Sequence, residues 1–439
     1  MQIVGAGLAG PLLALLLAQR GRDVTLMERG PDPRGDTRTA GRSINLALAA
    51  RGVRALHAAG LRDVVTPLLL PMRGRMLHDA QDAQLQVYGL RRDEIIYSVS
   101  RAELNRALIT AAATEPRITL RFAQQCIGVQ PTYNTLHMRE VDTGHTYSLA
   151  LRTTIATDGG GSAVRHALQA GGLIDAREDL LDHGYKELTI PPRQGEFALS
   201  PQALHIWPRG GFMLIALPNL DRSFTATVFL AKHGADSFES LRTEADIRGF
   251  FAREFPSAYA LMPDLSSEFA ANPVGLLGTV HCAPWHFGDQ LLLLGDAAHA
   301  IVPFHGQGMN CAFEDCIELA DLLDQNKSIE TAFTEFSAKR QPNTAAIATM
   351  ALENYTEMRA TVLDPTFQRR KAVALQLEQR FPQRFIPRYS MVMFHPEISY
   401  SEALRRGSVQ SGILDDLERA APGGDLDWTL ARQLIEARL

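Results

Sequence analysis

The chain has 439 residues, of which 46% are hydrophobic and 21% are charged, so its composition is that of a globular protein and excludes a disordered or fibrous one. With 44 Lys and Arg residues against 49 Asp and Glu residues, the formal net charge of −5 argues against binding to a nucleic-acid backbone. The four cysteines form no CxxC pair, which argues against a disulfide framework or a zinc site and favours a reducing compartment.

A strand, a glycine-rich turn and an apolar helix are predicted at the start of the chain. The strand ends at Val4, the turn over 5–10 has the spacing G-x-G-x-x-G, and the helix continues to Ala18. Such glycines permit a tight turn, the approach of a pyrophosphate and close packing of helix on strand. A second strand, 24–27, ends at Glu28, where a carboxylate can bond a ribose hydroxyl. The alternative, a signal peptide, is disfavoured because no basic residue precedes the apolar run and the run is short.

An antiparallel sheet is expected to interrupt this nucleotide-binding fold. Strand-like and helix-like pieces alternate to about residue 170, and three short strands separated by turns follow at 204–207, 212–217 and 224–230. A strand-then-helix pattern returns at 291–324, and a helical pattern continues from about 330 to 385. The sequence therefore predicts an α/β (α+β) fold with a Rossmann-like domain, an inserted antiparallel sheet and a C-terminal helical region.

Two further motifs follow apolar, strand-like stretches. The first is Asp158-Gly159, and the second is Gly295-Asp296 after four leucines. Asp296 can bond a ribose or ribityl hydroxyl, and the glycine-rich turn after it opens a helix whose N-terminus would stabilise negative charge on a reduced flavin. Taken singly, each motif has a plainer explanation, because Asp-Gly is a common turn and Gly-Asp after a strand can be a helix cap.

In this order, the three motifs resemble the FAD-binding set of the single-component aromatic hydroxylases. Further runs narrow the resemblance to the kynurenine 3-monooxygenase family, and it extends from Gly5 to about Met391. These runs are 41–48 (GRSINLAL), 72–76 (MRGRM), 98–101 (SVSR), 204–208 (LHIWP), 303–310 (PFHGQGMN), 353–358 (ENYTEM) and 385–391 (FIPRYSM). One departure lies after Asp158, where three successive glycines leave the loop geometry open.

The resemblance implies FAD as the cofactor, with matching positions in two groups. Those at the pyrophosphate turn and on the ribose side are Gly5, Gly7, Ala9, Gly10, Glu28 and Arg29. The others are Arg42, Ala47, Arg101, Asp158, Asp296, Gly308, Met309 and Asn310. Asp158 is expected to organise the pyrophosphate region from behind. No second G-x-G-x-x-G unit is evident, which agrees with transient binding of NADPH in such hydroxylases.

The resemblance also implies that an arginine, a tyrosine and an asparagine hold the substrate's amino-acid carboxylate. The matching residues are Arg75, Tyr88 and Asn354. A guanidinium group pairs bidentately with a carboxylate, and neutral donors complete the shell; the plainer alternative for Arg75 is a solvated strand arginine. Glu357 and Tyr389 lie in matching runs, and Glu357 is expected either to meet the substrate ammonium or to pair with a helix arginine such as Arg359.

A dry, apolar pocket beside the flavin is implied for the aromatic end of the substrate. The matching positions are Leu204, Ile215, Leu217, Phe229, Pro303 and Phe304, with His305 and Gln307 beside the flavin run. Ile215 and Leu217 are two residues apart and so share one face of a strand, although plain core packing also explains each apolar residue. No side chain is assigned as a catalytic acid or base, because the flavin is the oxidant, and His299 is expected to be structural.

The activity that the resemblance implies is an NADPH- and FAD-dependent monooxygenase. It would convert L-kynurenine to 3-hydroxy-L-kynurenine through a flavin hydroperoxide formed with dioxygen, in tryptophan degradation. The protein would supply position and dryness. Two alternatives stay open: a related hydroxylase acting on another aromatic acid or a substituted kynurenine, and, less favoured, a non-catalytic FAD-fold binding protein.

The resemblance also sets expectations for domains and surroundings. The FAD-binding domain is expected at 1–70, 95–175 and 270–330, the substrate sheet at 71–94 and 176–269, and a helical region capping the substrate pocket at 331–439. Residues 410–439 contain no spanning apolar run, unlike the anchored eukaryotic relatives, so a cytoplasmic enzyme without a membrane anchor, a metal or a nucleic-acid partner is predicted. A homodimer is compatible with the resemblance. A basic group is expected to form a solvated helix face, and it comprises Arg369, Arg370, Lys371, Arg380, Arg384 and Arg388.

Overall fold

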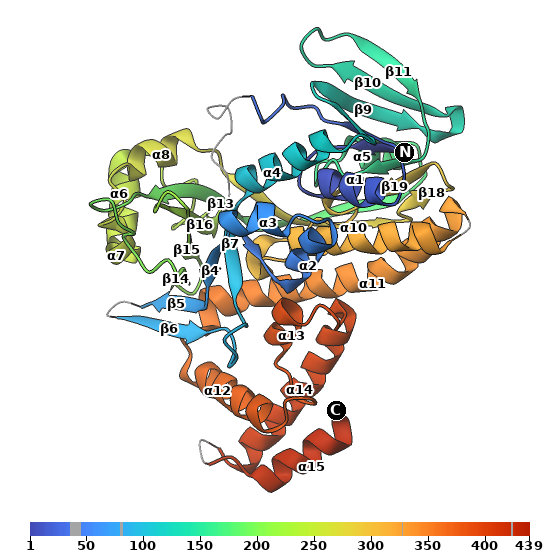
Figure 1. Cartoon of the computed structure of the whole chain (residues 1–439). Helices are drawn as coiled ribbons and strands as arrows, with labels where there is room; N and C mark the ends of the chain where they lie inside the picture. The colour runs from blue at the N-terminus through green and yellow to red at the C-terminus, as the bar shows by residue number, and fades with distance from the viewer. Residues whose placement is uncertain (36–44, 80–81, 327, 423–424) are drawn as a thin grey trace. The chain divides into compact units, whose positions relative to one another are not determined.

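The structure is a computed structural model that describes residues 1–35, 45–79, 82–326, 328–422 and 425–439 (Figure 1). The chain forms two compact units, each built from three separate segments. The first unit comprises 1–69, 99–181 and 277–344, and the second comprises 70–98, 182–276 and 345–439. None of the helices in the described ranges has the length and apolar character needed to cross a membrane.

A six-stranded sheet forms the centre of the first unit. Its order is β18 (His286–Phe287), β19 (Leu291–Leu293), β12 (Thr154–Ala156), β1 (Gln2–Val4), β2 (Val24–Met27) and β8 (Ile118–Arg121). All neighbours pair in parallel except the edge strand β18. The chain leaves β1 toward β2 on one side and later returns to β12 on the other. Ligands of doubly wound sheets bind at such a switch point, beyond the carboxyl ends of the strands.

Helix α1 (Ala9–Gln19) is buried along nearly its whole length, which explains its almost uniformly apolar sequence. Residues 10–18 are all buried, because α1 lies on the sheet and also contacts α4 (Arg101–Thr114) and α10 (Gly308–Gln325). A helix that is apolar on every side is one that other elements surround. The predicted strand–turn–helix–strand order at the start of the chain is confirmed, and the second strand has the predicted bounds.

A small three-stranded antiparallel sheet also belongs to the first unit. The sequence indicated strand-like pieces in this region but did not predict that they form a meander. It consists of β9 (Gln124–Gln130), β10 (Thr135–Glu140) and β11 (Thr146–Ala150), and α5 (Ala163–Ala170) packs against β9. Many residues of β11 are exposed or half-buried, so the apolar alternation that would mark it in the sequence is weak.

The second unit contains most of a seven-stranded sheet. Its order is β17 (Gly275–Ala283), β13 (Asp175–Ile190), β16 (Phe224–Ala231), β15 (Met213–Pro218), β14 (Ala203–Pro208), β5 (Gly74–His78) and β6 (Ala83–Val87). The three strands predicted in this region are confirmed to within one residue at each end. One face packs on α6 (Glu244–Glu254), α7 (Pro256–Tyr259) and α8 (Leu265–Ala271) through a core that includes Trp207, Leu214 and Val228.

Helices form most of the remainder of the chain. They are α11 (Ile329–Thr356), a π-helical turn (Glu357–Thr361), α12 (Pro365–Arg380), α13 (Arg388–Phe394), α14 (Tyr400–Ala420) and α15 (Trp428–Arg438). The C-terminal helices α12, α14 and α15 share a small hydrophobic core, which includes Leu377, Phe385, Ile413 and Ile435. The predicted C-terminal helical region is therefore confirmed.

Candidate functional site

The glycine-rich turn after β1 has the geometry of a phosphate-binding turn. Gly5 has φ +98°, and a Cβ there would lie 2.6 Å from the carbonyl oxygen of Thr157, while a Cβ at Gly10 would lie 2.1 Å from the carbonyl oxygen of Gly5. These two glycines let β1, β12 and α1 approach one another. At Gly7 a Cβ would meet no atom within 4 Å, so open space lies outside the turn where a pyrophosphate can approach its backbone.

Glu28, at the end of β2, is tied to this turn. Its Oε2 accepts a hydrogen bond from the backbone N–H of Ala6 and its Oε1 accepts one from Gly30, each at 2.7 Å. A carboxylate has about four acceptor positions, so ribose hydroxyls can still bond to it. Asn105 on α4, which the sequence did not suggest, donates to the carbonyl oxygens of Ala6 and Gly7 at 2.9 and 2.7 Å. Its side chain holds the turn from the other side.

The Asp-Gly motif places a buried carboxylate behind this turn. Asp158 Oδ2 accepts a hydrogen bond from the backbone N–H of Val164 at 3.4 Å, while Oδ1 is buried without a hydrogen-bond partner among the described residues. Burial raises the pKa of Asp158, against the lowering effect of a hydrogen bond from Ser162. A hydroxyl of a ligand or a bridging water would satisfy Oδ1. The three glycines do not prevent α5 from starting with Ser162 as its cap.

Asn310 organises the start of α10. Its Oδ1 accepts a hydrogen bond from the backbone N–H of Ala49 at 2.9 Å, and its Nδ2 donates to the carbonyl oxygens of Ala47 and Gly306 at 2.9 and 2.8 Å. The amide side chain is thus used to hold two loops around the helix N-terminus. The first backbone N–H groups of α10, at Gly308 and Met309, have no acceptor within the helix and suit a negatively charged ligand group.

The remaining flavin-side positions lie in the first unit. Asp296 follows β19 and is exposed, Arg101 opens α4, and Arg29 follows Glu28 and is exposed. Arg42 lies outside the described residues. Four predicted pocket residues belong to the turn before α10: Pro303 is exposed, whereas Phe304, His305 and Gln307 are buried. The open space at Gly7, the free carboxylate oxygen of Asp158 and the α10 N-terminus together fit a dinucleotide cofactor such as FAD.

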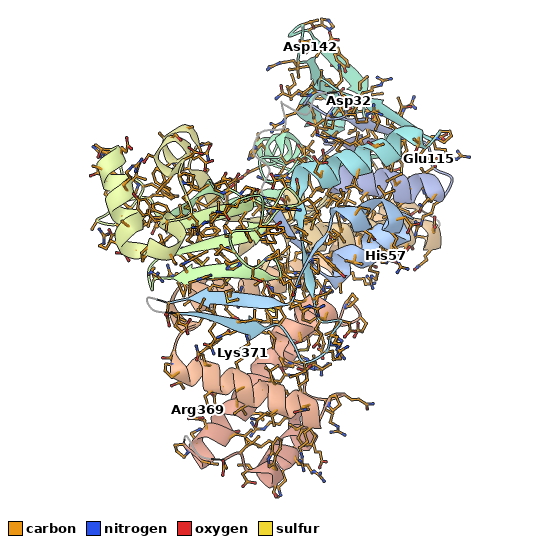
Figure 2. The ribbon with its side chains drawn as sticks, turned by 60° about the vertical axis from the view of Figure 1, so that its left-hand side comes forward. Asp32, His57, Glu115, Asp142, Arg369 and Lys371 are labelled. Atoms are coloured by element: carbon orange, nitrogen blue, oxygen red, sulfur yellow. The ribbon has the colours of Figure 1, made fainter. Side chains whose placement is uncertain are left out.

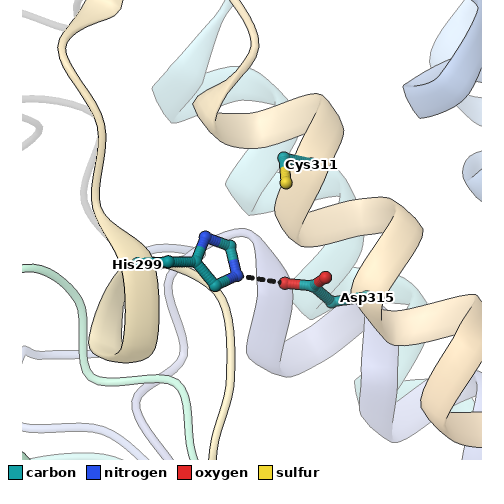
Figure 3. Close-up of side chains that lie close together, drawn as sticks. All are labelled: His299, Cys311 and Asp315. Carbon is teal, nitrogen blue, oxygen red and sulfur yellow. Dashed lines mark hydrogen bonds and ion pairs between the residues drawn. The ribbon is translucent and has the colours of Figure 1, made fainter. Parts of the chain in front are cut away.

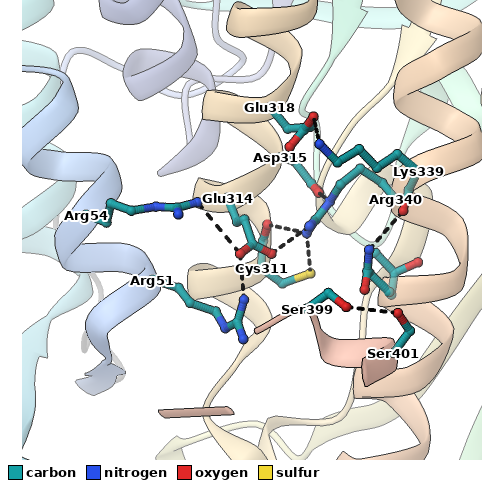
Figure 4. Close-up of polar contacts among 12 residues, drawn as sticks. Arg51, Arg54, Cys311, Glu314, Asp315, Glu318, Lys339, Arg340, Ser399 and Ser401 are labelled. Atoms are coloured by element: carbon teal, nitrogen blue, oxygen red, sulfur yellow. Dashed lines mark hydrogen bonds and ion pairs between the residues drawn. The ribbon is translucent and has the colours of Figure 1, made fainter. Parts of the chain in front are cut away.

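A chain of buried ion pairs lies behind the Gly-Asp turn. His299 Nε2 lies 2.6 Å from Asp315 Oδ2 (Figure 3), and Asp315 Oδ1 accepts a hydrogen bond from Arg340 Nε at 2.6 Å. Arg340 also donates to Glu314, which accepts a further hydrogen bond from Arg51, both at 2.6 Å (Figure 4). Burial alone would raise the pKa of Asp315, but Arg340 and His299 hold it below its usual value. The role of His299 is thus structural, as predicted.

Three side chains of this cluster have the spacing of metal ligands, but an arginine already contacts two of them. His299, Cys311 and Asp315 offer ligand atoms within 4.8 Å of one another. The guanidinium group of Arg340 already contacts two of the three, Asp315 at 2.6 Å and the Cys311 sulfur at 3.4 Å, and so supplies the positive charge there. Burial raises the pKa of the Cys311 thiol well above its usual value, which disfavours the thiolate that a metal needs.

In the second unit, four predicted residues surround the buried guanidinium group of a fifth, Arg75. Arg75 on β5 is 5% exposed; its Nη1 lies 3.1 Å from Glu357 Oε1 and its Nη2 lies 3.5 Å from Asn354 Oδ1. The guanidinium carbon lies 4.7 Å from the ring centroid of Tyr389, which stacks on Tyr88 at 5.6 Å. These residues come from β5, the end of β6, α11, the π-helical turn and α13. We call them the Arg75 cluster.

Two alternatives weighed from the sequence are wrong here. Arg75 is not a solvated strand arginine, because it is buried, and the ion-pair partner of Glu357 is Arg75 and not Arg359. Arg359 instead lies over the ring of Tyr355, 4.6 Å from its centroid. Residues two apart on a helix do not face each other, so Glu357 and Arg359 point in different directions from the π-helical turn at Glu357–Thr361.

The surroundings of the Arg75 cluster keep Arg75 positively charged and keep the phenols of Tyr88 and Tyr389 neutral. Burial opposes the charge of Arg75, but Tyr389, Glu357 and Tyr88 outweigh it and raise its pKa above the ordinary value. Burial raises the pKa of both Tyr88 and Tyr389, so both phenols are neutral hydrogen-bond donors. Arg75 Nε is buried without a hydrogen-bond partner among the described residues, so the guanidinium keeps a donor for a ligand.

The apolar residues predicted in this unit share a sheet face with Arg75. Arg75 pairs with Leu204 across β5 and β14, and Ile206 pairs with Ile215 across β14 and β15. Because side chains alternate along a strand, Leu204, Ile215 and Leu217 point to the same face as Arg75, and Phe229, opposite Met213, joins them. The core against α6–α8 uses the other face. These side chains therefore do not belong to that core.

Lys371 was not recognised as part of this region, and the predicted solvated face is wrong at this residue. Its Nζ donates to Gln86 Oε1 at 3.3 Å, and burial, followed by the charge of Arg75, lowers its pKa to about 8. The nearby basic residues do face acidic partners: Arg369 lies 3.1 Å from Glu418, and Arg370 pairs with Asp415. Successive residues on a helix point about 100° apart, so Lys371 can reach Gln86 on β6 while Arg369 and Arg370 pair with residues of α14.

Comparison with known proteins adds names to this geometry. The FAD binding domain family matches residues 1–349. A kynurenine 3-monooxygenase of Myxococcus xanthus (strain DK1622) is 46% identical over 440 residues, covering 100% of this chain and 95% of the relative. One of Xanthomonas axonopodis pv. citri (strain 306) is 45% identical over 452 residues, covering 100% and 97%.

Solved structures agree on the fold. A 2-methyl-3-hydroxypyridine-5-carboxylic acid oxygenase is similar with a TM-score of 0.65 at 20% identity, over 83% of this chain and 93% of that chain. PqsL of P. aeruginosa, in complex with 2-aminobenzoylacetate, is similar with a TM-score of 0.65 at 22% identity, over 82% and 96%. The fold predicted from the sequence, that of the FAD-dependent aromatic hydroxylases, is thereby confirmed.

Proposed function

Because the chain belongs to the kynurenine 3-monooxygenase family of FAD-dependent aromatic monooxygenases, we propose that it hydroxylates L-kynurenine to 3-hydroxy-L-kynurenine. NADPH is the proposed reductant and dioxygen the proposed oxygen source. The observation that carries the proposal is the Arg75 cluster, in which a buried arginine with a free donor lies beside a carboxylate and two neutral phenols. This set suits an α-amino acid substrate.

The cofactor is held by the first unit. The turn at 5–10 would hold its phosphates, the N-terminus of α10 would stabilise negative charge on its ring, and Glu28 and Asp296 would bond its hydroxyls. When bound there, FAD would supply the redox and oxygen-transfer chemistry of the reaction. Asn105 and Asn310 hold the two loops and do not need to touch the cofactor with their side chains. Arg42 is retained in the proposal on sequence grounds alone.

The Arg75 cluster recognises the amino-acid end of the substrate. Arg75 binds the carboxylate with its guanidinium group, and Tyr88, Tyr389 and Asn354 add neutral hydrogen bonds. Glu357, now paired with Arg75 at 3.1 Å, turns to the substrate ammonium. The exchange keeps each charge paired, since Arg75 gains a carboxylate as it loses Glu357. A substrate without the amino-acid end would separate Arg75 from Glu357 without giving either residue a new charged partner.

The apolar sheet face positions the aromatic end. Leu204, Ile215, Leu217 and Phe229 project from the same face as Arg75 and keep water away from the ring. Exclusion of water protects the activated oxygen from wasteful release. The amino group makes the ring of kynurenine electron-rich, so it attacks an electrophilic oxygen without a protein acid or base. This explains why no side chain is assigned to proton transfer.

A related hydroxylase for another aromatic acid remains the competing proposal, and the non-catalytic alternative is set aside because the family consists of monooxygenases. The Arg75–Glu357 pair favours a zwitterion over a simple benzoate, since a benzoate has no ammonium for Glu357. A cytoplasmic location and a homodimer remain predictions from the sequence.

The test is turnover by the purified, flavin-loaded protein. With L-kynurenine present, we expect NADPH and dioxygen to be consumed together and 3-hydroxykynurenine to appear in equal amount, identified by chromatography and mass. Anthranilate and 4-hydroxybenzoate serve as controls for the rival substrate classes. Preferred hydroxylation of either control, or absence of 3-hydroxykynurenine, would overturn the proposal.

A further inference from the structure

We propose that Lys371 is a second cation of the substrate carboxylate site and makes the enzyme selective for aromatic substrates that carry a carboxylate. The inference deepens the proposed function and rests on it. It adds a residue from α12 to the Arg75 cluster, whose other members come from β5, the end of β6, α11, the π-helical turn and α13.

Three side chains form a row across the edge of the substrate sheet. Lys371 Nζ donates to Gln86 Oε1 at 3.3 Å, and Gln86 on β6 is the cross-strand partner of Arg75 on β5. Directly opposite residues in an antiparallel pair project to the same face. Lys371 therefore reaches from α12 to the face that carries Arg75. Figure 2 shows Lys371 on the side of α12 nearer to these strands and Arg369 on the other side.

The charges around Lys371 do not balance. The charged groups that face it are Arg75 on β5 and Glu357 on the π-helical turn, and Gln86 on β6 is neutral. Two cations thus share one carboxylate, and that carboxylate is already 3.1 Å from Arg75. Among the described residues, no acidic side chain comes within ion-pair distance of Lys371. Tyr88 and Tyr389 add no negative charge, because burial keeps their pKa values raised.

Lys371 is half-buried, and an uncompensated cation in a partly desolvated place destabilises the protein unless a ligand supplies the counter-charge. This explains why burial and Arg75 lower the pKa of Lys371 to about 8, so that it gives up its proton more readily than a surface lysine. A bound carboxylate has two oxygens and about four acceptor positions, enough for both Arg75 and Lys371. Of the three N–H donors of Lys371, one has an acceptor among the described residues.

A purely structural role fits the neighbouring residues better than it fits Lys371. Arg369 and Arg370, on the same helix, pair with Glu418 and Asp415 of α14 and so join two helices. Among the described residues, the hydrogen-bond partner of Lys371 is a neutral amide at 3.3 Å, which a glutamine at this position could satisfy and a methionine could replace without a partly buried charge. A lysine at this position therefore lowers the stability of the free protein, and the charge of a bound anion would offset that loss.

The test compares two ligands on three variants of the flavin-loaded protein. The ligands are L-kynurenine and kynurenamine, its decarboxylated analogue, and the Kd of each is measured from the change in flavin absorbance. The variants are Lys371→Met, Lys371→Arg and, as a matched loss of one positive charge from the same helix, Arg369→Met. Flavin content and circular dichroism establish that each variant is folded.

We expect Lys371→Met to raise the Kd of L-kynurenine roughly tenfold, the scale of one hydrogen bond to a charged group. The Kd of kynurenamine should stay within about twofold, Lys371→Arg should retain tight binding, and Arg369→Met should change neither Kd. Equal effects on both ligands, or none on L-kynurenine, would overturn the inference. If the unaltered protein binds no L-kynurenine at all, the proposed function itself fails, and the inference fails with it.

A pH series gives a readout that a structural role would not move. Lys371 loses its charge as the pH rises past its pKa, so the advantage of the unaltered protein over Lys371→Met should shrink toward none at high pH. The ammonium of the ligand titrates equally in both proteins and cancels in the ratio of the two Kd values. A ratio that stays constant from pH 6.5 to 9.5 would contradict a charge contact between Lys371 and the carboxylate.

Discussion

Two groups of charged side chains, one in each unit and each built around buried arginine, differ in their balance of positive and negative charge. In the first unit, Arg51 and Arg340 face Glu314 and Asp315, with His299 at the end of the chain of contacts. In the second, Arg75 and Lys371 share Glu357, and one N–H of Arg75 is left without an acceptor among the described residues. A balanced set satisfies itself and holds helices together. An unbalanced set can be completed by a ligand, and we propose that this difference separates a structural centre from a binding site.

The largest expected effect is on the balanced set. Replacing Arg340 by Met removes the cation that lies between Asp315 and Glu314 and leaves two buried carboxylates without it. We expect a loss of stability of about 3–5 kcal/mol, measured as a lower denaturant midpoint of the flavin-loaded protein. The adjacent Lys339, which pairs with Glu318 but is 61% exposed, is the control, and Lys339→Met should cost less than about 1 kcal/mol. Similar midpoints for the two variants would contradict this reading.

The second effect is on the unbalanced set and should spare stability. Arg75→Ala should weaken L-kynurenine binding by roughly 2–4 kcal/mol, because one partner of a buried charge pair is lost. Flavin content should remain normal, since every contact of Arg75 described above lies in the second unit. Titration of the flavin absorbance with L-kynurenine measures the binding. The ratio of flavin absorbance to protein absorbance in the purified protein measures the flavin content. Loss of flavin would show that Arg75 had been misassigned.

The smallest expected effect concerns Glu378, an acidic residue of α12 that lies nearer the C-terminal end of the helix than Lys371. Glu378 Oε2 is buried without a partner among the described residues, and burial, followed by the charge of Glu94, raises its pKa to about 7. A carboxyl whose folded pKa is raised favours the folded state when protonated. That contribution is complete below the unfolded pKa of about 4.5 and is lost as the pH rises through about 7.

Glu378→Gln should therefore raise the thermal midpoint at pH 8 by roughly 2 °C and leave it unchanged near pH 5. Differential scanning fluorimetry at the two pH values measures this, and Glu418→Gln, an exposed acidic residue that pairs with Arg369, is the control. A gain that is the same at both pH values would mean that Glu378 does not titrate in this range.

Much of the fold could be predicted because it depends on local patterns. The bounds of β2 and of the three central strands of the second sheet follow from apolar runs closed by turn residues. The meander β9–β11 could not be predicted, because an exposed strand such as β11 shows little alternation of apolar and polar residues. The π-helical turn at Glu357 escaped because no sequence period marks a single widened turn.

The candidate site shows the same division. Arg75, Tyr88, Asn354, Glu357 and Tyr389 could be named from the resemblance to the family, and the structure then brings them together. Asn105 and Lys371 could not, because each acts on an element far away in the chain, the first on the turn at 5–10 and the second on β6. A polar residue in a helix looks the same in the sequence whether it faces solvent or a neighbouring loop.

The most direct test of the account is a crystal structure of the flavin-loaded protein with L-kynurenine. We expect the substrate carboxylate within hydrogen-bond distance of the Arg75 guanidinium and of Lys371 Nζ, with Glu357 turned to the ammonium and the ring on the face of Leu204, Ile215 and Leu217. A carboxylate bound elsewhere, with the Arg75–Glu357 pair unchanged, would contradict the claim that this unbalanced set of charges is the binding site.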